Sequence, residues 1–220
     1  MKPSKAIKTF TDRYPLIGPS FWMLSVQYFI TQLVVAHDWA KPYSWTHNTI
    51  SDLGNSRCGM YGSRFVCSPL HNWMDASFIV LGLSMVIGAT LIYQEFRKSR
   101  ISAIGFGCMA AAGLGTVLVG LFPENTVSSL HIIGAALPFL VGNIGLVILG
   151  SALALPRTLR YYTILSGVVA LVALALLLTN NYLGIGVGGM ERLTAYPQTV
   201  WLIAFGIYMS SNHFRAKRHV

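Results

Sequence analysis

Six long apolar stretches constrain this 220-residue chain more than any other feature of its sequence. Most of them are near the roughly 20 residues that an α-helix needs to cross a bilayer. The last stretch is short, and we expect its helix to begin a few residues earlier. The sequence therefore predicts an all-α integral membrane bundle of six transmembrane helices. The stretches are Ile17–Ala36, Met74–Tyr93, Ile101–Phe122, Leu130–Leu155, Tyr161–Asn180 and Val200–Ser211.

Composition supports the membrane class. Charged residues make up 10% of the chain, whereas soluble domains carry about 25%. So few charges cannot cover the surface of a soluble protein of this length. The first apolar stretch lacks an A-x-A-like cleavage site and begins too far into the chain for an ordinary signal peptide, so we expect a retained helix.

The basic residues predict which way the bundle faces. Twelve of the 16 Lys and Arg residues fall in the two tails and in the second-to-third and fourth-to-fifth connections. The positive-inside rule then places both termini in the cytoplasm, as an even number of spans also requires. The formal net charge of +9 therefore reflects topology and contact with anionic headgroups, not nucleic-acid binding. We expect a multi-pass protein of the cell (inner or plasma) membrane.

This topology divides the chain into a basic cytoplasmic tail (1–15), a six-helix transmembrane domain (16–212) and a second basic tail (213–220). The first outer connection, residues 37–73, is long, rich in aromatic residues and not of low complexity, so we expect it to be ordered. Cys58 and Cys67 lie in it nine residues apart. Outside the cytoplasm two nearby thiols can pair, which predicts a disulfide.

Two further irregularities follow from glycine and proline. We expect Pro138 to kink the fourth helix, because neighbouring helices in a membrane can accommodate a proline. The third outer connection, residues 180–198, is rich in glycine, and we expect it to be partly re-entrant.

Ionisable and amide side chains gather at the outer ends of the predicted helices. Five of the seven acidic residues lie on or near that side, although acidic residues contribute little to orientation. Such groups are costly near a bilayer and usually face the bundle interior or water. They predict an outward-facing polar pocket. The set is His47, Asn48, Ser51, Asp52, His71, Asp75, Glu124, His131, Asn143, Glu191 and Arg192.

Two chemistries fit this set. In one, Ser51 is a nucleophile, with His131 or His71 as its base and Asp52 as an orienting carboxylate. In the other, His71, Asp75 and His131 bind a divalent metal such as zinc that activates water. The catalytic candidates are Ser51, Asp52, His71, Asp75, Glu124 and His131.

Each candidate also has a structural explanation. Ser51 and Asp52 before a glycine are ordinary turn formers. Asp75 is placed to pair with Arg64, and Glu191 with Arg192 is equally explained as a local patch that carries no chemistry. The candidates for substrate binding are Asn48, Asn143, Glu191 and Arg192.

Four blocks of the sequence carry a resemblance to a known family. They are YSWTHNTISDLGNSRCG, FVCSPLHNWMDASFIVLGL, VGLFPENTVSSLHIIGAALPFLVGNIGLVILG and GGMERLTAYPQTVWLIAFG. In their order the chain resembles, over about residues 15–212, a bacterial and archaeal family of six-helix membrane proteins, domain of unknown function 998. This resemblance implies the fold and the candidate site. Ile50-Ser51-Asp52, Gly54 and His131 are also distantly similar to damage-regulated autophagy modulators and glycosylphosphatidylinositol-remodelling membrane proteins, which implies lipid substrates.

The leading hypothesis is a membrane-embedded, lipid-active enzyme of the hydrolase or remodelling type. The alternative is a non-catalytic lipid-binding, scaffold or accessory subunit. A small transporter is disfavoured because the cytoplasmic halves of the predicted spans hold almost no ionisable residue, and a haem protein with His71 and His131 as axial ligands is a fourth reading. Membrane lipids are the expected partners, with a protein partner or homo-oligomer left open.

Overall fold

The computed structural model describes residues 5–96 and 99–218. Residues 1–4 and 219–220 of the predicted tails, and the basic residues Lys2, Arg97 and Lys98, lie outside the described part of the chain. Within it the chain is all-α apart from one small hairpin, as the sequence predicts.

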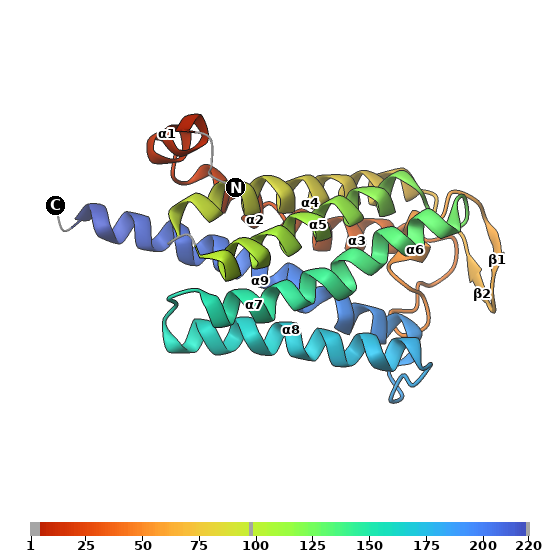
Figure 1. Ribbon diagram of the computed structural model, residues 1–220. Helices are drawn as coiled ribbons and strands as arrows, with labels where there is room; N and C mark the ends of the chain where they lie inside the picture. Colours follow the sequence, from red (N-terminus) through yellow and green to blue (C-terminus); the bar gives the residue numbers. More distant parts are fainter. Residues whose placement is uncertain (1–4, 97–98, 219–220) are drawn as a thin grey trace.

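The helices lie side by side in an elongated bundle (Figure 1). A 3₁₀ turn, η1, lies in the first long loop, a second, η2, follows α4, and a π-helical turn, η3, joins α6 to α7. The elements in chain order are α1 (Lys5–Arg13), α2 (Ile17–Met23), α3 (Val26–His37), η1 (Ser51–Gly54), β1 (Gly59–Tyr61), β2 (Arg64–Val66), α4 (His71–Ile92), η2 (Tyr93–Glu95), α5 (Arg100–Leu121), α6 (Ser128–Ala136), η3 (Leu137–Gly142), α7 (Asn143–Ala152), α8 (Arg157–Leu178) and α9 (Gly186–Arg218).

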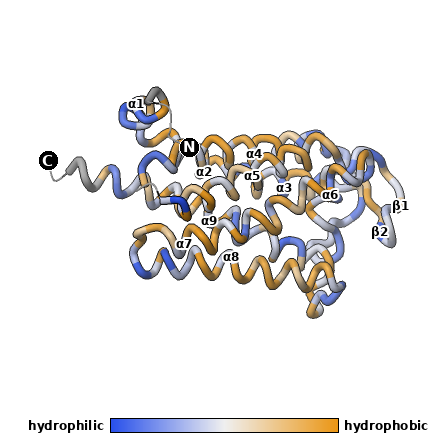
Figure 2. The backbone as a smooth tube through the Cα atoms, in the orientation of Figure 1, coloured by the Kyte–Doolittle hydropathy of each residue, from blue (hydrophilic) through white to orange (hydrophobic). Residues whose placement is uncertain are grey.

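Four helical stretches among the described residues are long and apolar enough to cross a membrane. Many large hydrophobic side chains on these stretches point outward, and Figure 2 shows hydrophobic residues along most of their length. A soluble protein does not expose apolar surface on this scale. The chain is therefore a polytopic membrane protein. The four stretches are His71–Glu95, Arg100–Leu121, Ser128–Ala152 and Arg157–Leu178.

The first apolar stretch differs from the single helix expected. It forms α2 and α3, separated by a tight turn at Leu24 and Ser25. Three hydrogen bonds of the i→i+3 type close this turn, and their acceptors are the carbonyls of Trp22, Leu24 and Ser25. The narrower turn redirects the chain without a proline or glycine, so the apolar pattern gave no sign of it.

The fourth predicted helix and the third outer connection also differ in part from expectation. Pro138 lies in η3, so the expected distortion takes the form of a π-helical turn. Residues 186–198, expected to be partly re-entrant, instead form the first turns of α9. The helix continues through Glu191 and Arg192 because groups of the first long loop satisfy these two side chains.

The connections between the helices are divided between the two ends of the bundle (Figure 1). Both termini lie at the same end as the α4–α5 and α7–α8 connections. The hairpin β1–β2 lies at the other end with the α5–α6 and α8–α9 connections. The ordered loop and the expected disulfide between Cys58 and Cys67 are both confirmed. We call these two ends the terminal end and the hairpin end.

Candidate functional site

The segment Asn48–Gly54 forms a turn at the hairpin end that the buried carboxylate of Asp52 organises. Asp52 Oδ2 accepts hydrogen bonds from Thr49 N at 2.9 Å and from Asn48 Nδ2 at 3.2 Å. Thr49 Oγ1 in return accepts a hydrogen bond from Asp52 N at 3.1 Å. This reciprocal pair closes a local turn over Thr49–Asp52 at the start of η1, whose first residue is Ser51. The predicted turn role of Asp52 is thus confirmed.

Arg64 holds Asp52 from the hairpin. Its Nε and Nη2 lie 2.9 Å from Asp52 Oδ2 and Oδ1, a bidentate ion pair. The alternative pairing of Arg64 with Asp75 is therefore wrong. Burial opposes the charge of Asp52, but the hydrogen bonds and charge of Arg64 outweigh it and lower the pKa of this carboxyl. Asp52 is a structural anion of the loop.

Glu124 joins the same network from the α5–α6 connection. Burial and the adjacent Asp52 carboxylate raise the pKa of Glu124 to about 9, so this side chain is protonated at neutral pH. Asn55 Nδ2 donates to Glu124 Oε1 at 3.0 Å, and the Tyr61 hydroxyl donates to the Glu124 carbonyl at 3.1 Å. These contacts fasten the first outer loop to the connection that leads into α6.

Ser51 and His131 meet although they are far apart in sequence. His131, in the first turn of α6, places Nε2 3.0 Å from Ser51 Oγ. Its Nδ1 lies 2.9 Å from the Phe122 carbonyl oxygen. On the other side, Ser51 Oγ lies 3.2 Å from Glu191 Oε1, and Glu191 Oε2 accepts a short hydrogen bond from Ile50 N. A single serine hydroxyl therefore sits between an imidazole and a carboxyl group.

The hydrogens of this chain of contacts can be counted. A carbonyl oxygen only accepts, so His131 Nδ1 carries a hydrogen. In a neutral imidazole Nε2 is then bare and accepts the Ser51 proton, and Glu191 must be protonated to donate to Ser51 Oγ. In the other arrangement, with the same number of protons, His131 is a cation, Ser51 donates to Glu191, and Glu191 is a carboxylate. Both arrangements give a continuous proton path through Ser51.

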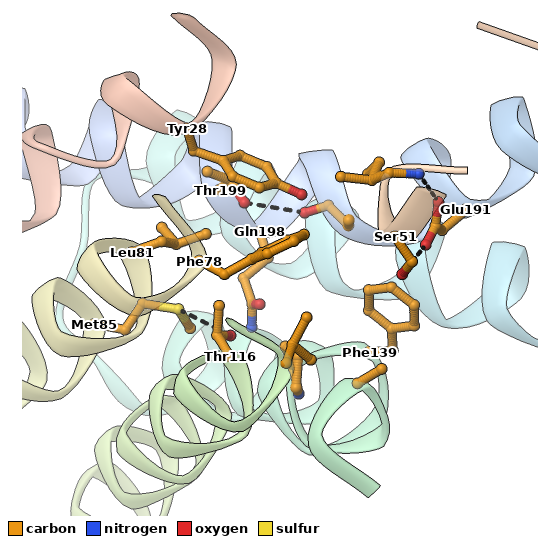
Figure 3. A pocket seen from close by; sticks show the side chains of 15 residues that line it. Tyr28, Ser51, Phe78, Leu81, Met85, Thr116, Phe139, Glu191, Gln198 and Thr199 are labelled. Atoms are coloured by element: carbon orange, nitrogen blue, oxygen red, sulfur yellow. Dashed lines mark hydrogen bonds between the residues drawn. The ribbon is translucent and has the colours of Figure 1, made fainter. Parts of the chain in front are cut away.

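Ser51 and Glu191 close the polar end of an internal cavity (Figure 3). Its other walls are mostly apolar, with Phe78 and Phe139 among them, and Gln198 lies deeper in the bundle. The cavity offers about 40 Å³ of room for water, and one water needs about 10–15 Å³. It therefore has space for a few water molecules beside the serine hydroxyl.

Arg192 is buried beside Glu191, and its guanidinium group contacts mainly the first outer loop. Its Nη1 donates to the carbonyl oxygens of Trp45, Asn48 and Gly188 at 3.0, 2.8 and 2.9 Å. Its Nη2 donates a short hydrogen bond to the Tyr43 hydroxyl. A side chain on Gly188 would collide with the Asn48 carbonyl oxygen, since a Cβ there would lie 2.1 Å from it. Glu191 and Arg192 are thus both buried and contact groups of the first outer loop.

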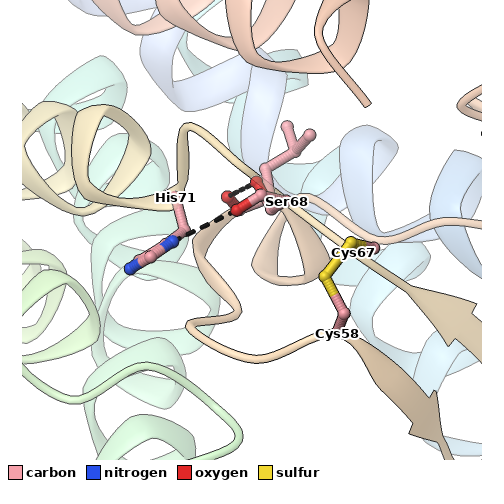
Figure 4. The surroundings of a disulfide bond; sticks show 5 residues. Cys58, Cys67, Ser68 and His71 are labelled. Atoms are coloured by element: carbon pink, nitrogen blue, oxygen red, sulfur yellow. Dashed lines mark hydrogen bonds between the residues drawn. A yellow bond between two sulfur atoms is a disulfide. The ribbon is translucent and has the colours of Figure 1, made fainter. Parts of the chain in front are cut away.

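Four residues of the predicted polar set do not join Ser51. His71 is half-buried, and its Nδ1 contacts the Ser68 carbonyl at 3.1 Å near the disulfide (Figure 4). Asp75 packs against Gly54, and its Oδ1 has no hydrogen-bond partner among the described groups. Asn143 lies between helices, where its Nδ2 donates to Phe139 and Thr194 carbonyls. His47 stays exposed, with hydrogen bonds to Ser44 and Thr46.

The metal set expected from the sequence is not assembled. Within residues 5–96 and 99–218, no three His, Cys, Asp or Glu side chains converge as a metal site would require. Both ring nitrogens of His131 are engaged, by Phe122 and Ser51, which leaves neither for a metal or a haem in this arrangement. His71, Asp75 and His131 therefore do not form the expected metal-binding group here.

Sequence reasoning missed some of the residues that build this site. Tyr43, one of the aromatic residues of the first outer loop, is among them: its hydroxyl donates to the Thr49 carbonyl at 2.7 Å and accepts a hydrogen bond from Arg192. The Phe122 carbonyl is a backbone group and leaves no signal in a sequence. Asn55 lies three residues after Asp52 in the polar segment, and its pairing with the predicted residue Glu124 leaves no signal in the sequence.

Comparison with known proteins adds a family. No curated protein and no solved structure shows significant similarity to the chain. Residues 23–208, which include every element from α3 to α8 and most of α9, match the family described as "Protein of unknown function (DUF998)". The resemblance seen in the sequence blocks is thereby confirmed, and the chain belongs to the DUF998 family.

Proposed function

We propose that the bundle crosses the membrane six times, with both termini in the cytoplasm of the cell. The pair α2–α3 and the helix α9 would supply the two spans beyond the four apolar ones. Together α2 and α3 cover residues 17–37, long enough for about 30 Å of helix. The gathering of the basic tails and connections at the terminal end supports this orientation. Single cysteines at exposed positions of the hairpin should react with an impermeant maleimide in intact cells, and cysteines near the termini should not.

We propose further that the protein is a serine hydrolase acting on an ester or amide of a membrane lipid. One observation carries this proposal: His131 Nε2 lies 3.0 Å from Ser51 Oγ while a carbonyl fixes the other ring nitrogen. A serine nucleophile needs a base within hydrogen-bond reach, and that base in turn needs an orienting group. In this proposal the Phe122 carbonyl, and not Asp52, orients the imidazole ring of His131.

The reaction would proceed in two steps. Ser51 Oγ attacks the carbonyl carbon as its proton passes to His131 Nε2, and the tetrahedral species collapses when His131 returns this proton to the leaving alcohol or amine. The product is an acyl group on Ser51. A water molecule activated by His131 then attacks the acyl carbon and releases the carboxylic acid. Glu191 is a positioning residue that orients Ser51 and the Ile50 backbone.

The cavity gives the proposal its substrate class. Apolar walls beside a polar end suit an acyl chain attached to a carbonyl group, and the water-sized space beside Ser51 suits the hydrolytic water. Room for a few waters does not hold an acyl chain, so substrate binding requires the surrounding side chains to part. Product release or opening is therefore the expected slow step.

Turnover in lipid nanodiscs tests the proposal. Purified protein should release fatty acid from at least one class in a panel of phospholipids and N-acylated lipids. Ser51→Ala and His131→Ala should each lower the rate by at least about a thousandfold. Ser151→Ala, which removes an exposed serine on α7, should retain the full rate. Equal rates in Ser51→Ala and Ser151→Ala would overturn the proposal.

A further inference from the structure

A second site lies outside the Ser51 cavity, in a groove between α8 and α9. It has about 770 Å³ of room, within the roughly 300–1,000 Å³ range typical of small-molecule sites. Its walls include the exposed side chains of Leu165, Val169 and Val200. No residue that lines the Ser51 cavity also lines this groove. The two sites use different faces of α9, so this inference does not depend on the proposed hydrolysis.

Arg192 stands at the polar end of this groove. It is 7% exposed, and the oxygens that its two Nη atoms contact are three backbone carbonyls and one tyrosine hydroxyl, all neutral. Its buried Nε has no hydrogen-bond partner among the described groups. The neighbouring Glu191 lines the Ser51 cavity and makes no ion pair with Arg192.

This arrangement leaves a buried cation with no anion in ion-pair contact in the described part of the chain, and Glu191 attracts it only through space. The ion pair found there joins Arg64 to Asp52. Buried charges in proteins are ordinarily paired, because an unpaired charge in a medium of low dielectric constant is costly. Trp45 adds a cation–π contact, with its ring centre 4.8 Å from the guanidinium carbon, and it lines the same groove. A cation–π contact eases this cost but supplies no negative charge.

We propose that the groove binds an anionic phospholipid. Its phosphate group would lie near Arg192 and supply the missing negative charge, and an acyl chain would lie along α8 and α9. Arg192 also borders a smaller groove on the α3 side, whose walls include Phe29 and Leu33. Apolar surface on both flanks of one buried cation matches the chemistry of a lipid at its headgroup–acyl boundary.

Native mass spectrometry with added lipid tests this site. The probes are dioleoyl phosphatidylglycerol and dioleoyl phosphatidylcholine, which share acyl chains and differ in net charge. Every variant carries Ser51→Ala, so hydrolysis cannot consume the probe and a failure of the proposed reaction leaves this measurement intact. The starting protein should bind phosphatidylglycerol at least about tenfold more tightly than phosphatidylcholine, a difference of about 1.4 kcal/mol.

Matched variants locate the binding. Val169→Trp should fill the groove and abolish the preference, whereas Val168→Trp, on an equally exposed neighbour outside the groove, should keep it. Arg192→Gln should also lose the preference, and Arg57→Gln, an exposed arginine of the hairpin end, should not. Because Arg192 supports the loop, the tryptophan pair decides the matter if Arg192→Gln does not fold. Equal binding of both lipids, or equal behaviour of Val168→Trp and Val169→Trp, would overturn the proposal.

Discussion

The two ends of the bundle are held together by different forces. At the terminal end, Trp22 of α2 packs against Trp201 and Phe205 of α9, with ring centres 5.2 and 5.6 Å apart. At the hairpin end, the contacts are hydrogen bonds and one ion pair around Asp52 and Ser51. Aromatic packing depends on shape and area, while the polar network depends on direction and protonation.

The two ends therefore differ in what their side chains can do: the terminal end offers packing, and the hairpin end offers groups that exchange protons. An aromatic cluster tolerates small shifts of its rings and offers no group that exchanges protons. The hairpin end instead buries Asp52, His131, Glu191 and Arg192, each of which is costly to bury unless its polar atoms are satisfied. Asp52 and Arg192 hold the first outer loop through such contacts, whereas His131 and Glu191 meet at Ser51, where the proposed chemistry takes place.

The largest expected effect on stability is at the terminal end. Trp22 is fully buried, and its ring fits against Gly88 so closely that a Cβ there would lie 2.1 Å from it. Trp22→Ala should lower the free energy of unfolding by about 3–5 kcal/mol, measured by denaturant titration in micelles. Trp73→Ala, at a tryptophan that is 66% exposed, is the control and should change little. A Trp22→Ala variant of unchanged stability would contradict the comparison.

Removal of the disulfide should have the next largest effect. Cys58 and Cys67 close a loop of nine residues in sequence separation, for which chain entropy predicts a loss of about 2.5 kcal/mol. The double variant Cys58→Ser/Cys67→Ser should unfold more readily by this amount, while Cys108→Ser, at the free cysteine, should not. If the hairpin variants match Cys108→Ser in thermal stability, the disulfide does not stabilise the hairpin end.

Breaking the ion pair should cost somewhat less. Arg64→Gln leaves the fully buried Asp52 carboxylate without its cation, although Thr49 and Asn48 still donate to it. We expect a loss of about 2 kcal/mol, below the value for a fully buried pair because the Arg64 side chain is 22% exposed.

A double-mutant cycle sharpens this prediction. Arg64→Gln/Asp52→Asn should recover part of the lost stability, since it removes the unpaired charge. Arg57→Gln, at an exposed arginine of the same loop, is the control for loss of charge alone. Strict additivity of the two changes would show that Arg64 and Asp52 do not interact in solution.

The last predicted effect is a dependence of stability on pH. Glu124 has a pKa of about 9 in the folded chain against an ordinary 4.5, so the folded state binds the extra proton. Its contribution is complete below pH 4.5 and is lost as the pH rises toward about 9. Asp52, with its lowered pKa, contributes in the opposite sense and loses its share only in acid.

Glu124→Gln isolates this contribution, because the amide resembles the protonated carboxyl. The melting temperature of the unaltered chain should fall between pH 6 and pH 9 (conditions that we choose to bracket the titration), and the Glu124→Gln variant should show a smaller slope. Asn125→Asp, on the neighbouring residue, serves as a charge control. Parallel slopes for the unaltered chain and Glu124→Gln would contradict a protonated Glu124.

Hydropathy alone was sufficient for the helices whose side chains meet lipid or apolar neighbours. The expected stretches Ile101–Phe122 and Tyr161–Asn180 differ by a few residues from α5 and α8. Hydropathy did not predict the first turns of α9, because Glu191 and Arg192 make this helical segment less apolar. Their compensating partners, such as Asn48, lie more than a hundred residues away and cannot be assigned from one sequence.

The candidate site shows the same limit. Ser51 and His131 were both recognised as candidates by residue type and depth, but the choice of partner depends on how the loop docks on α6. The 80 residues between them carry no local signal of that contact. His71 was an equally reasonable base on sequence, and the turn at Ser68 directs its Nδ1 to a backbone carbonyl instead.

The most direct test of the central claim is covalent labelling of Ser51. Protein in native membranes is treated with a fluorophosphonate, digested and examined by mass spectrometry for the modified residue. We predict an adduct on Ser51 that disappears in His131→Ala and persists in Trp73→Ala. A folded protein in which Ser51 remains unlabelled, or is labelled equally without His131, would contradict an activated serine at the hairpin end.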